Sequence, residues 1–241
     1  MSHAQPAAPR HFLVLPAAGI GQRMGSECPK QYLEINGKSL LQHTLERLGS
    51  MECFFRVVLI LAPQDSWWPT VASQLPVPLL GKLITVTGGN QRADSVLNGL
   101  HALRDIAAVS DWTLVHDVVR PCIRRSDVEL LIATLEHDEA GGILATPVRD
   151  TLKRASTAQA VEQTVDRSNL WCAATPQMFR YGLLRAALIQ MADSGRVVTD
   201  EAEAMEAGGH RVKLVQGRAD NLKVTYPQDL QLAAVILGAE S

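Results

Sequence analysis

The sequence lacks the patterns that define several common classes of protein. No apolar run reaches the roughly 18–20 residues that a membrane-spanning helix requires. The four cysteines form no CxxC pair and match no zinc-site spacing, so we expect reduced, partly buried thiols in a cytoplasmic protein. The formal net charge is only -2, whereas general nucleic-acid-binding proteins usually carry a basic excess. We therefore expect neither a membrane nor a nucleic-acid partner.

What the sequence does contain is enough apolar material for one large core. The chain has 241 residues, of which 46% are hydrophobic, and this length suits one larger domain. We interpret residues 1–10, "MSHAQPAAPR", as a disordered leader, because they lack the positive cluster of a signal peptide. Residues 11–241 are then a single domain.

Short apolar runs alternate with stretches of helical periodicity. The runs predict buried strands at 12–16, 56–62, 83–87, 112–116 and 142–146, with a later strand at 210–216. Helices are expected at 39–48, 91–103, after 126, at 181–193, at 200–207 and from 227. Asn90, Ser126 with Glu129, and Thr225 with Gln228 are the candidate caps. This alternation predicts an α/β fold, with a Rossmann-like, mostly parallel sheet sandwiched by helices.

Residues 147–172 interrupt this alternation. The stretches "DTLKRA" and "VEQTVDR" resemble two strands joined by the polar link "STAQA", and neither is apolar enough for a central strand. We expect a β-hairpin arm that projects from the core. Because an unpaired strand edge is a liability unless something covers it, the arm favours a homodimer.

The glycine-rich segment 16–35, "PAAGIGQRMGSECPKQYLEI", follows the first strand, and ligands bind at the carboxyl ends of parallel strands. It is not a Walker A loop, because GxxxxGK[ST] is absent. It is not a full dinucleotide fingerprint either, because Gly19 and Gly21 are followed by Met24 at the third glycine position. Small residues beside the cations Arg23 and Lys30 suit a triphosphate.

This segment resembles the signature of sugar-nucleotide and alditol-phosphate nucleotidyltransferases, and "ECPKQY" narrows it to the cytidylyltransferases. Further strings are similar to one family, the 2-C-methyl-D-erythritol 4-phosphate cytidylyltransferases of the non-mevalonate isoprenoid pathway: "GGNQRADSV", "LVHDVVRP", "PVRDTLKRA", "TVDRSNLW", "TPQMF", "TDEA" and "GRADNLKVT". The resemblance extends from about residue 12 to residue 237. It implies that CTP and the alditol phosphate give a CDP-alditol and pyrophosphate, with Mg²⁺ as the cofactor.

The resemblance also implies roles for individual residues. Its catalytic cations are Arg23, Lys30, Arg167 and Lys223. Its CTP-binding residues are Ala17, Ala18, Gly19, Gly21, Gly89, Asn90, Ser95 and Asp117, of which Asp117 also holds the metal. Its alditol phosphate-binding residues are Thr151, Arg167, Thr175, Thr199, Asp220 and Lys223. If the arm crosses a dimer, Arg167 acts in the partner's site.

Some of these residues have structural alternatives. Asp117 is either a metal ligand or the partner of Arg120 in an ion pair. Asp220 either orients Lys223 or a sugar hydroxyl, or holds a turn. Arg167 is otherwise a charge on an exposed hairpin, and His116 is expected to face the core.

The chain departs from the family's pattern at four positions. Asn90 and Gln91 stand where acidic residues are common, which changes the expected ribose contacts. Val118 and Val119 stand where alanines are common, which narrows the sugar side of the pocket. Separately, the pair Trp67–Trp68 is either a helix-start feature or an aromatic platform for a base.

Two rival functions remain open. A cytidylyltransferase for another alditol phosphate, such as ribitol phosphate, shares the CTP half of the motifs. A non-catalytic nucleotide-binding module shares the fold, although the intact set of cations disfavours it. A dehydrogenase is less consistent with the loop, because the third glycine is missing.

Overall fold

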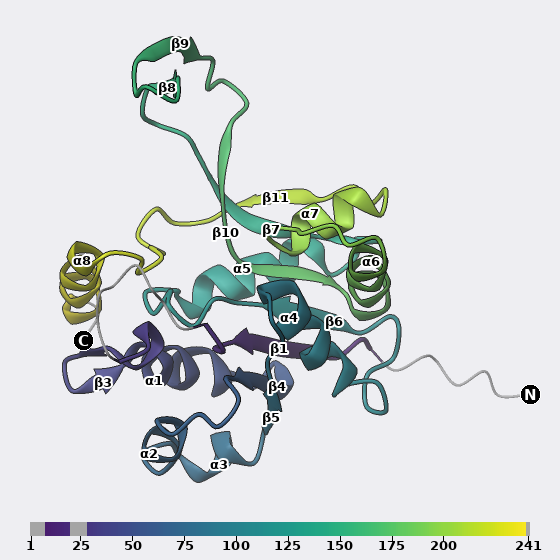
Figure 1. The fold of residues 1–241 in the computed structure, drawn as a ribbon. Helices are drawn as coiled ribbons and strands as arrows, with labels where there is room; N and C mark the ends of the chain where they lie inside the picture. Colours follow the sequence, from purple (N-terminus) through teal and green to yellow (C-terminus); the bar gives the residue numbers. More distant parts are fainter. Residues whose placement is uncertain (1–7, 20–27, 240–241) are drawn as a thin grey trace, which may run out of the picture.

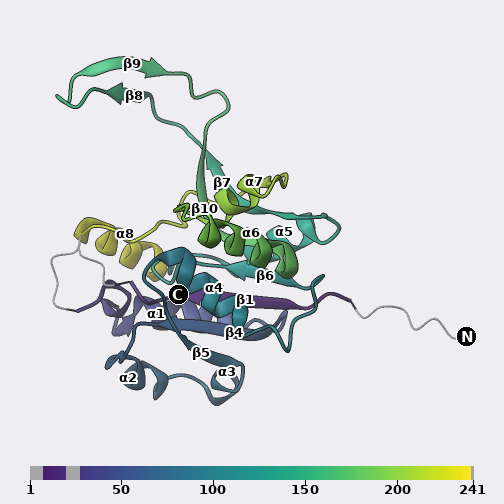
Figure 2. The same ribbon diagram turned by 45° about the vertical axis from the view of Figure 1, so that its right-hand side comes forward.

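A seven-stranded sheet forms the centre of the computed structural model, which describes residues 8–19 and 28–239 (Figures 1 and 2). The strand order is β11-β7-β10-β6-β1-β4-β5, and β10 alone among these strands runs antiparallel to its neighbours. The strands are β1 His11–Pro16, β4 Phe54–Leu61, β5 Leu83–Thr87, β6 Trp112–Val115, β7 Gly141–Pro147, β10 Trp171–Arg180 and β11 Lys213–Gln216. The mostly parallel sheet is thus confirmed.

Helices cover both faces of this sheet. Successive side chains of a strand point to opposite faces, so the apolar strands present a hydrophobic layer on each side. Leu13 and Leu15 pack into one core layer, and Phe12 and Val14 pack into the other. The first layer is covered by α1 Leu40–Thr44, η3 Leu45–Gly49, α2 Trp68–Ala72, α3 Val77–Leu80, α5 Arg125–Leu135 and α8 Pro227–Gly238. The second layer is covered by α4 Arg92–His101, α6 Tyr181–Asp193 and α7 Glu201–Ala207.

The expected arm is present and extends well beyond the helical layers (Figure 1). Its outer part is a two-stranded hairpin of β8 Leu152–Ala155 and β9 Val161–Val165. Its base is formed by the ends of β7 and β10, where Trp171 pairs with Pro147. The base of the arm is therefore continuous with the central sheet, and residues 148–151 and 166–170 link it to the outer hairpin.

The predicted helix caps Asn90, Ser126 and Thr225 need correction by one or two residues. The helix α4 begins after Gln91 and not Asn90, and α5 begins after Arg124. In both helices an aspartate three residues beyond the cap accepts the backbone N–H of the capping residue. The last helix follows Tyr226 in the same manner. In each case the residue that reaches back is aspartate, whereas the sequence interpretation assigned this role to Glu129 and Gln228 in the last two helices.

The structure also changes the interpretation of the N-terminal leader and adds small elements between residues 30 and 39. The leader interpretation falls mainly on residues 1–7, outside the described residues, but Arg10 is held by two contacts to Asp111, at 2.8 and 2.9 Å. Small elements that sequence reasoning missed are η2 Lys30–Tyr32, β2 Glu34–Ile35 and β3 Lys38–Ser39. Within the described ranges, no helix is both long and apolar enough to cross a membrane.

Candidate active site

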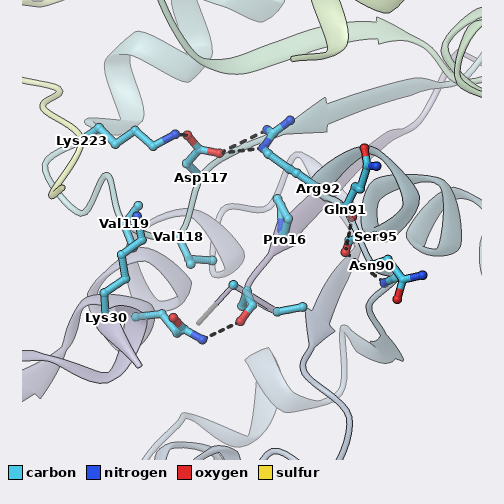
Figure 3. A pocket seen from close by; sticks show the side chains of 15 residues that line it. Pro16, Lys30, Asn90, Gln91, Arg92, Ser95, Asp117, Val118, Val119 and Lys223 are labelled. Atoms are coloured by element: carbon cyan, nitrogen blue, oxygen red, sulfur yellow. Dashed lines mark hydrogen bonds and ion pairs between the residues drawn. The ribbon is translucent and has the colours of Figure 1, made fainter. Parts of the chain in front are cut away.

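A pocket of about 220 Å³ opens where the loops after β1, β5 and β6 meet (Figure 3). Seven of the residues predicted to bind CTP line it: Ala17, Ala18, Gly19, Gly89, Asn90, Ser95 and Asp117. The predicted cations Lys30 and Lys223 line it as well, with Val118 and Val119 on the same wall. The carboxyl edge of the sheet therefore gathers the glycine-rich loop and a carboxylate, as the motif order predicted.

The glycine-rich loop is anchored at its start, where both the N–H and the carbonyl of Ala17 are hydrogen-bonded. The N–H of Ala17 donates to Ile60 on β4 at 2.7 Å, which continues the ladder of the sheet. The carbonyl of Ala17 accepts from the side-chain amide of Gln31 at 2.7 Å. Gln31 belongs to η2, which also carries Lys30, so this buried bond sets the distance between the loop and its lysine.

The turn after β5 forms a second wall. The Ser95 hydroxyl accepts from the N–H of Gly89 at 3.1 Å and lies 3.0 Å from the carbonyl of Gln91. A Cβ added to Gly88 would lie 2.5 Å from the Cβ of Ala18, so this turn packs directly against the glycine-rich loop. Ser95 therefore shapes the turn that faces the pocket.

Asp117 lies at the centre of a cluster of cations, as Figure 3 shows. Its Oδ1 accepts from Arg92 at 3.1 Å, and its Oδ2 lies 2.8 Å from the Lys223 ammonium. Arg120 approaches Oδ2 at 3.8 Å, so the ion pair considered as an alternative role for Asp117 exists. The carboxylate holds several positive groups at the mouth of one pocket.

These contacts set the charge of the site. Burial alone would raise the pKa of the Asp117 carboxyl, but the adjacent charges of Arg92, Lys223 and Arg120 hold it well below its ordinary value. Burial lowers the pKa of Arg92, but the charges of Glu201 and Asp117 outweigh this and raise it. Asp117 and Arg92 are therefore both ionised at neutral pH.

Behind Asp117 lies a layer of buried polar contacts. The hydroxyl of Thr175 accepts from the backbone N–H of Asp117 at 3.1 Å and contacts the ring of His116 at 3.1 Å. His116 faces the core, as predicted, and burial lowers its pKa to about 4. Asn221 donates to the carbonyl of Thr175 at 2.8 Å. Thr175, predicted to bind the alditol, thus supports the Asp117 loop with a 4% exposed side chain.

Other predicted residues lie elsewhere. Thr151 and Arg167 belong to the arm, where Arg167 donates to the carbonyl of Arg149. Thr199 lines a separate hollow beside α7, together with Trp171 at the base of the arm. Within the described part of the chain, these three predicted residues do not line the pocket of Asp117.

The contacts of Asp220 differ from the expected contact with Lys223. Its carboxylate pairs with Arg124 at 3.0 Å and with Arg218 at 2.7 Å, whereas Lys223 pairs with Asp117. Asp220 therefore does not orient Lys223 by a direct ion pair. Its interpretation as the holder of a turn fits these contacts, since Arg218 lies two residues before it.

Gly21 and Arg23 lie outside the described residues, so their predicted roles stay predictions. Two residues of the site were missed by sequence reasoning, namely Arg92 and the buried Glu201 that binds it. Arg92 lies within the quoted string "GGNQRADSV" and Glu201 within "TDEA", so their motifs were noticed while their contact was not.

Comparisons with known proteins give a consistent result. The sequence model for 2-C-methyl-D-erythritol 4-phosphate cytidylyltransferase matches residues 11–239. A relative of that name from Dechloromonas aromatica is 53% identical over 232 residues, covering 96% of this chain and 99% of the relative. One from Hahella chejuensis is 49% identical over 226 residues, covering 94% and 92%.

Solved structures agree with this. A crystal structure of 4-diphosphocytidyl-2C-methyl-D-erythritol synthase shares 38% identity at a TM-score of 0.81, covering 95% of this chain and 98% of that one. The Francisella tularensis 2-C-methyl-D-erythritol 4-phosphate cytidylyltransferase shares 31% identity at a TM-score of 0.79, covering 94% and 99%.

Proposed function

The chain belongs to the 2-C-methyl-D-erythritol 4-phosphate cytidylyltransferase family, and from this premise we propose that it transfers the cytidylyl group of CTP to that alditol phosphate. The products are 4-diphosphocytidyl-2-C-methyl-D-erythritol and pyrophosphate. The observation that carries the proposal is the meeting of Lys30, Asp117 and Lys223 at one pocket, whose walls are the predicted CTP-binding loops.

The reaction needs charge neutralisation more than proton transfer. A phosphate oxygen of the alditol attacks the α-phosphorus of CTP, and the bond from that phosphorus to the β-phosphate oxygen breaks. Pyrophosphate leaves with the bonding electrons. Because the attacking oxygen is already anionic, no general base is required, and catalysis reduces to positioning and electrostatic stabilisation.

The cations divide this work. In this proposal Lys30, carried by η2, neutralises the phosphates of CTP together with Arg23. Lys223 holds the phosphate of the alditol, with Arg167 from the partner's arm as the second cation. The backbone N–H of Val224 donates to the carbonyl of Val119 at 2.9 Å, which ties the segment of Lys223 to the Asp117 loop.

Asp117 is chemically suited to a divalent cation. Mg²⁺ prefers oxygen ligands and takes most of them from phosphate and water, so one carboxylate suffices. Among the described residues, no group of three or more His, Cys, Asp or Glu is arranged to hold an ion without a substrate. Asp117 would hold Mg²⁺ through its carboxylate. When bound, the ion neutralises triphosphate charge.

We further propose a homodimer that works in the cytoplasm. The arm presents exposed apolar side chains, with Val161 63% and Trp171 38% exposed, and its hairpin has two strands. A second subunit seated there would cover these surfaces. The cytoplasmic location follows from the interpretation of the cysteines as reduced thiols.

The test is pyrophosphate release from CTP with Mg²⁺, with methylerythritol phosphate and ribitol phosphate offered separately. We expect release with the first acceptor. Lys30→Ala should lower kcat/KM by a factor of about 100 or more, because a preorganised positive charge at the phosphates is lost. The matched control Lys38→Ala removes a surface lysine paired with Glu46, and should leave the rate within about twofold.

Each other outcome has a distinct meaning. Release with ribitol phosphate alone would keep the mechanism and overturn the acceptor. Absence of release with either acceptor would refute the proposed function and favour a nucleotide-binding module.

A further inference from the structure

A row of alternating charges runs from the start of α7 into the pocket. The carboxylate of Glu201 accepts two hydrogen bonds from Arg92, at 2.6 and 3.1 Å. Arg92 donates from its other edge to Oδ1 of Asp117, and Oδ2 of Asp117 faces Lys223. Glu201 is the member of this row farthest from the pocket, and it is buried, with only 1% of its surface exposed.

The backbone around Glu201 is held on both sides. The side-chain amide of Gln177, on β10, donates to the Asp200 carboxylate at 2.9 Å and accepts the N–H of Ala202 at 2.9 Å. Asp200 in turn caps α7 by accepting the N–H of Glu203. Glu201 therefore extends toward Arg92 from a backbone that the central sheet fixes in place.

This arrangement gives Glu201 control over Arg92. A guanidinium is a rigid planar fork, so fixing one edge on Glu201 also fixes the direction of the other edge. That second edge meets Oδ1 of Asp117, which leaves Oδ2 directed at Lys223.

We propose that Glu201 is a positioning residue for the reaction, which acts through Arg92 to hold the Asp117 carboxylate beside Lys223. This inference rests on the proposed function. Within the described residues Glu201 does not line the pocket, so it acts without touching a substrate. Glu201 therefore affects how the reacting phosphates are aligned, and does not affect how tightly the nucleotide binds.

Glu201→Gln tests this directly. We expect kcat for pyrophosphate release to fall about tenfold, while KM for CTP stays within about twofold, because a misplaced carboxylate affects alignment in the transition state. The control Glu206→Gln makes the same charge change on the same helix at an exposed position, and should leave both constants unchanged. A folded Glu201→Gln variant with kcat within about twofold of the wild type would overturn the proposal.

A double variant tests the route through Arg92. Arg92→Gln/Glu201→Gln removes the ion pair as a unit, so no uncompensated buried charge remains and the protein should fold. Its kcat should equal that of Arg92→Gln alone, because residues that act through one another are not additive. Losses that multiply, or a double variant within about twofold of the wild type, would overturn the proposal.

The wild type separates this inference from the proposed function. A wild type that releases no pyrophosphate with methylerythritol phosphate refutes the proposed function. An active wild type with an equally active Glu201→Gln variant refutes the role of Glu201 alone.

Discussion

His116 is a buried imidazole beside the charged cluster, and its protonation state is set by its surroundings. Burial, assisted by the charge of Arg120 and opposed by that of Asp117, lowers its pKa to about 4. The unfolded chain would have a pKa of 6.5 at this residue. Between these two values the unfolded state binds more protons than the folded state.

Stability should therefore decline on acidification. The stabilisation is fully present above pH 6.5 and is lost as the pH falls toward 4, which lowers the free energy of unfolding by about 3 kcal/mol. Denaturant titrations across this range would measure the decline. His116→Gln, which does not titrate, should show a shallower decline. Parallel curves for the two proteins would contradict the assignment.

The sequence could predict which residues gather at the pocket but not how they contact one another. Asp117 directly follows an apolar strand pattern, and strand ends converge at one edge of the sheet, whereas Lys30 and Lys223 were assigned to the site by the family resemblance. Arg92 and Glu201 are 109 residues apart, and no local pattern links them. Their contact depends on α6, which packs against both α4 and α7, so neither helix encodes it alone.

At the scale of elements, the turn between β5 and α4 packs tightly on the glycine-rich loop. Gly88 is the point of contact, because an added Cβ would also lie 3.0 Å from the Ser95 hydroxyl. Ala18 lines the pocket, so any displacement of it changes the space for the nucleotide.

Gly88→Ala should therefore weaken CTP binding about tenfold or more and destabilise the fold by about 1–3 kcal/mol, because overpacking displaces Ala18. Calorimetric titration with CTP and a thermal melt would measure the two effects. Gly81→Ala is the matched control, since its added Cβ would meet nothing closer than 3.6 Å. Equal CTP affinity in both variants would show that the turn tolerates the methyl group.

The elements themselves were predicted unevenly. The predicted strand at 83–87 and the predicted helix at 181–193 agree with the structure residue for residue. The first is a short β-branched run and the second keeps one helical periodicity throughout, so each has a single clear pattern. The ten-residue β10 was missed. Its first half is exposed on the arm and its second half is buried, and Pro176 interrupts the pattern, so no single periodicity spans it.

At the scale of the whole molecule, the arm sets Arg167 apart from the pocket of its own chain. If Arg167 serves the partner's pocket, each pocket of a dimer draws on two chains. Two defective subunits should then complement one another when their defects lie on different sides of the interface.

Mixing Lys30→Ala with Arg167→Ala under subunit exchange should restore about a quarter of the wild-type activity. Random assembly makes about half of the dimers mixed, and each mixed two-fold dimer has one intact pocket of two. Pyrophosphate release measures the recovery. The control mixture of Lys30→Ala with Lys223→Ala should recover nothing, since both lysines line the same pocket. Equal results for the two mixtures would refute the shared site.

The continuity of β10 also bears on how the gene can diverge. One strand carries Trp171 at the base of the arm and Gln177 beside α7, and a single inserted codon between them would turn every later side chain to the opposite face. The hairpin tip at 156–160 has no such register to preserve. Length polymorphism should accordingly accumulate at the tip, while β10 keeps its length and varies by substitution.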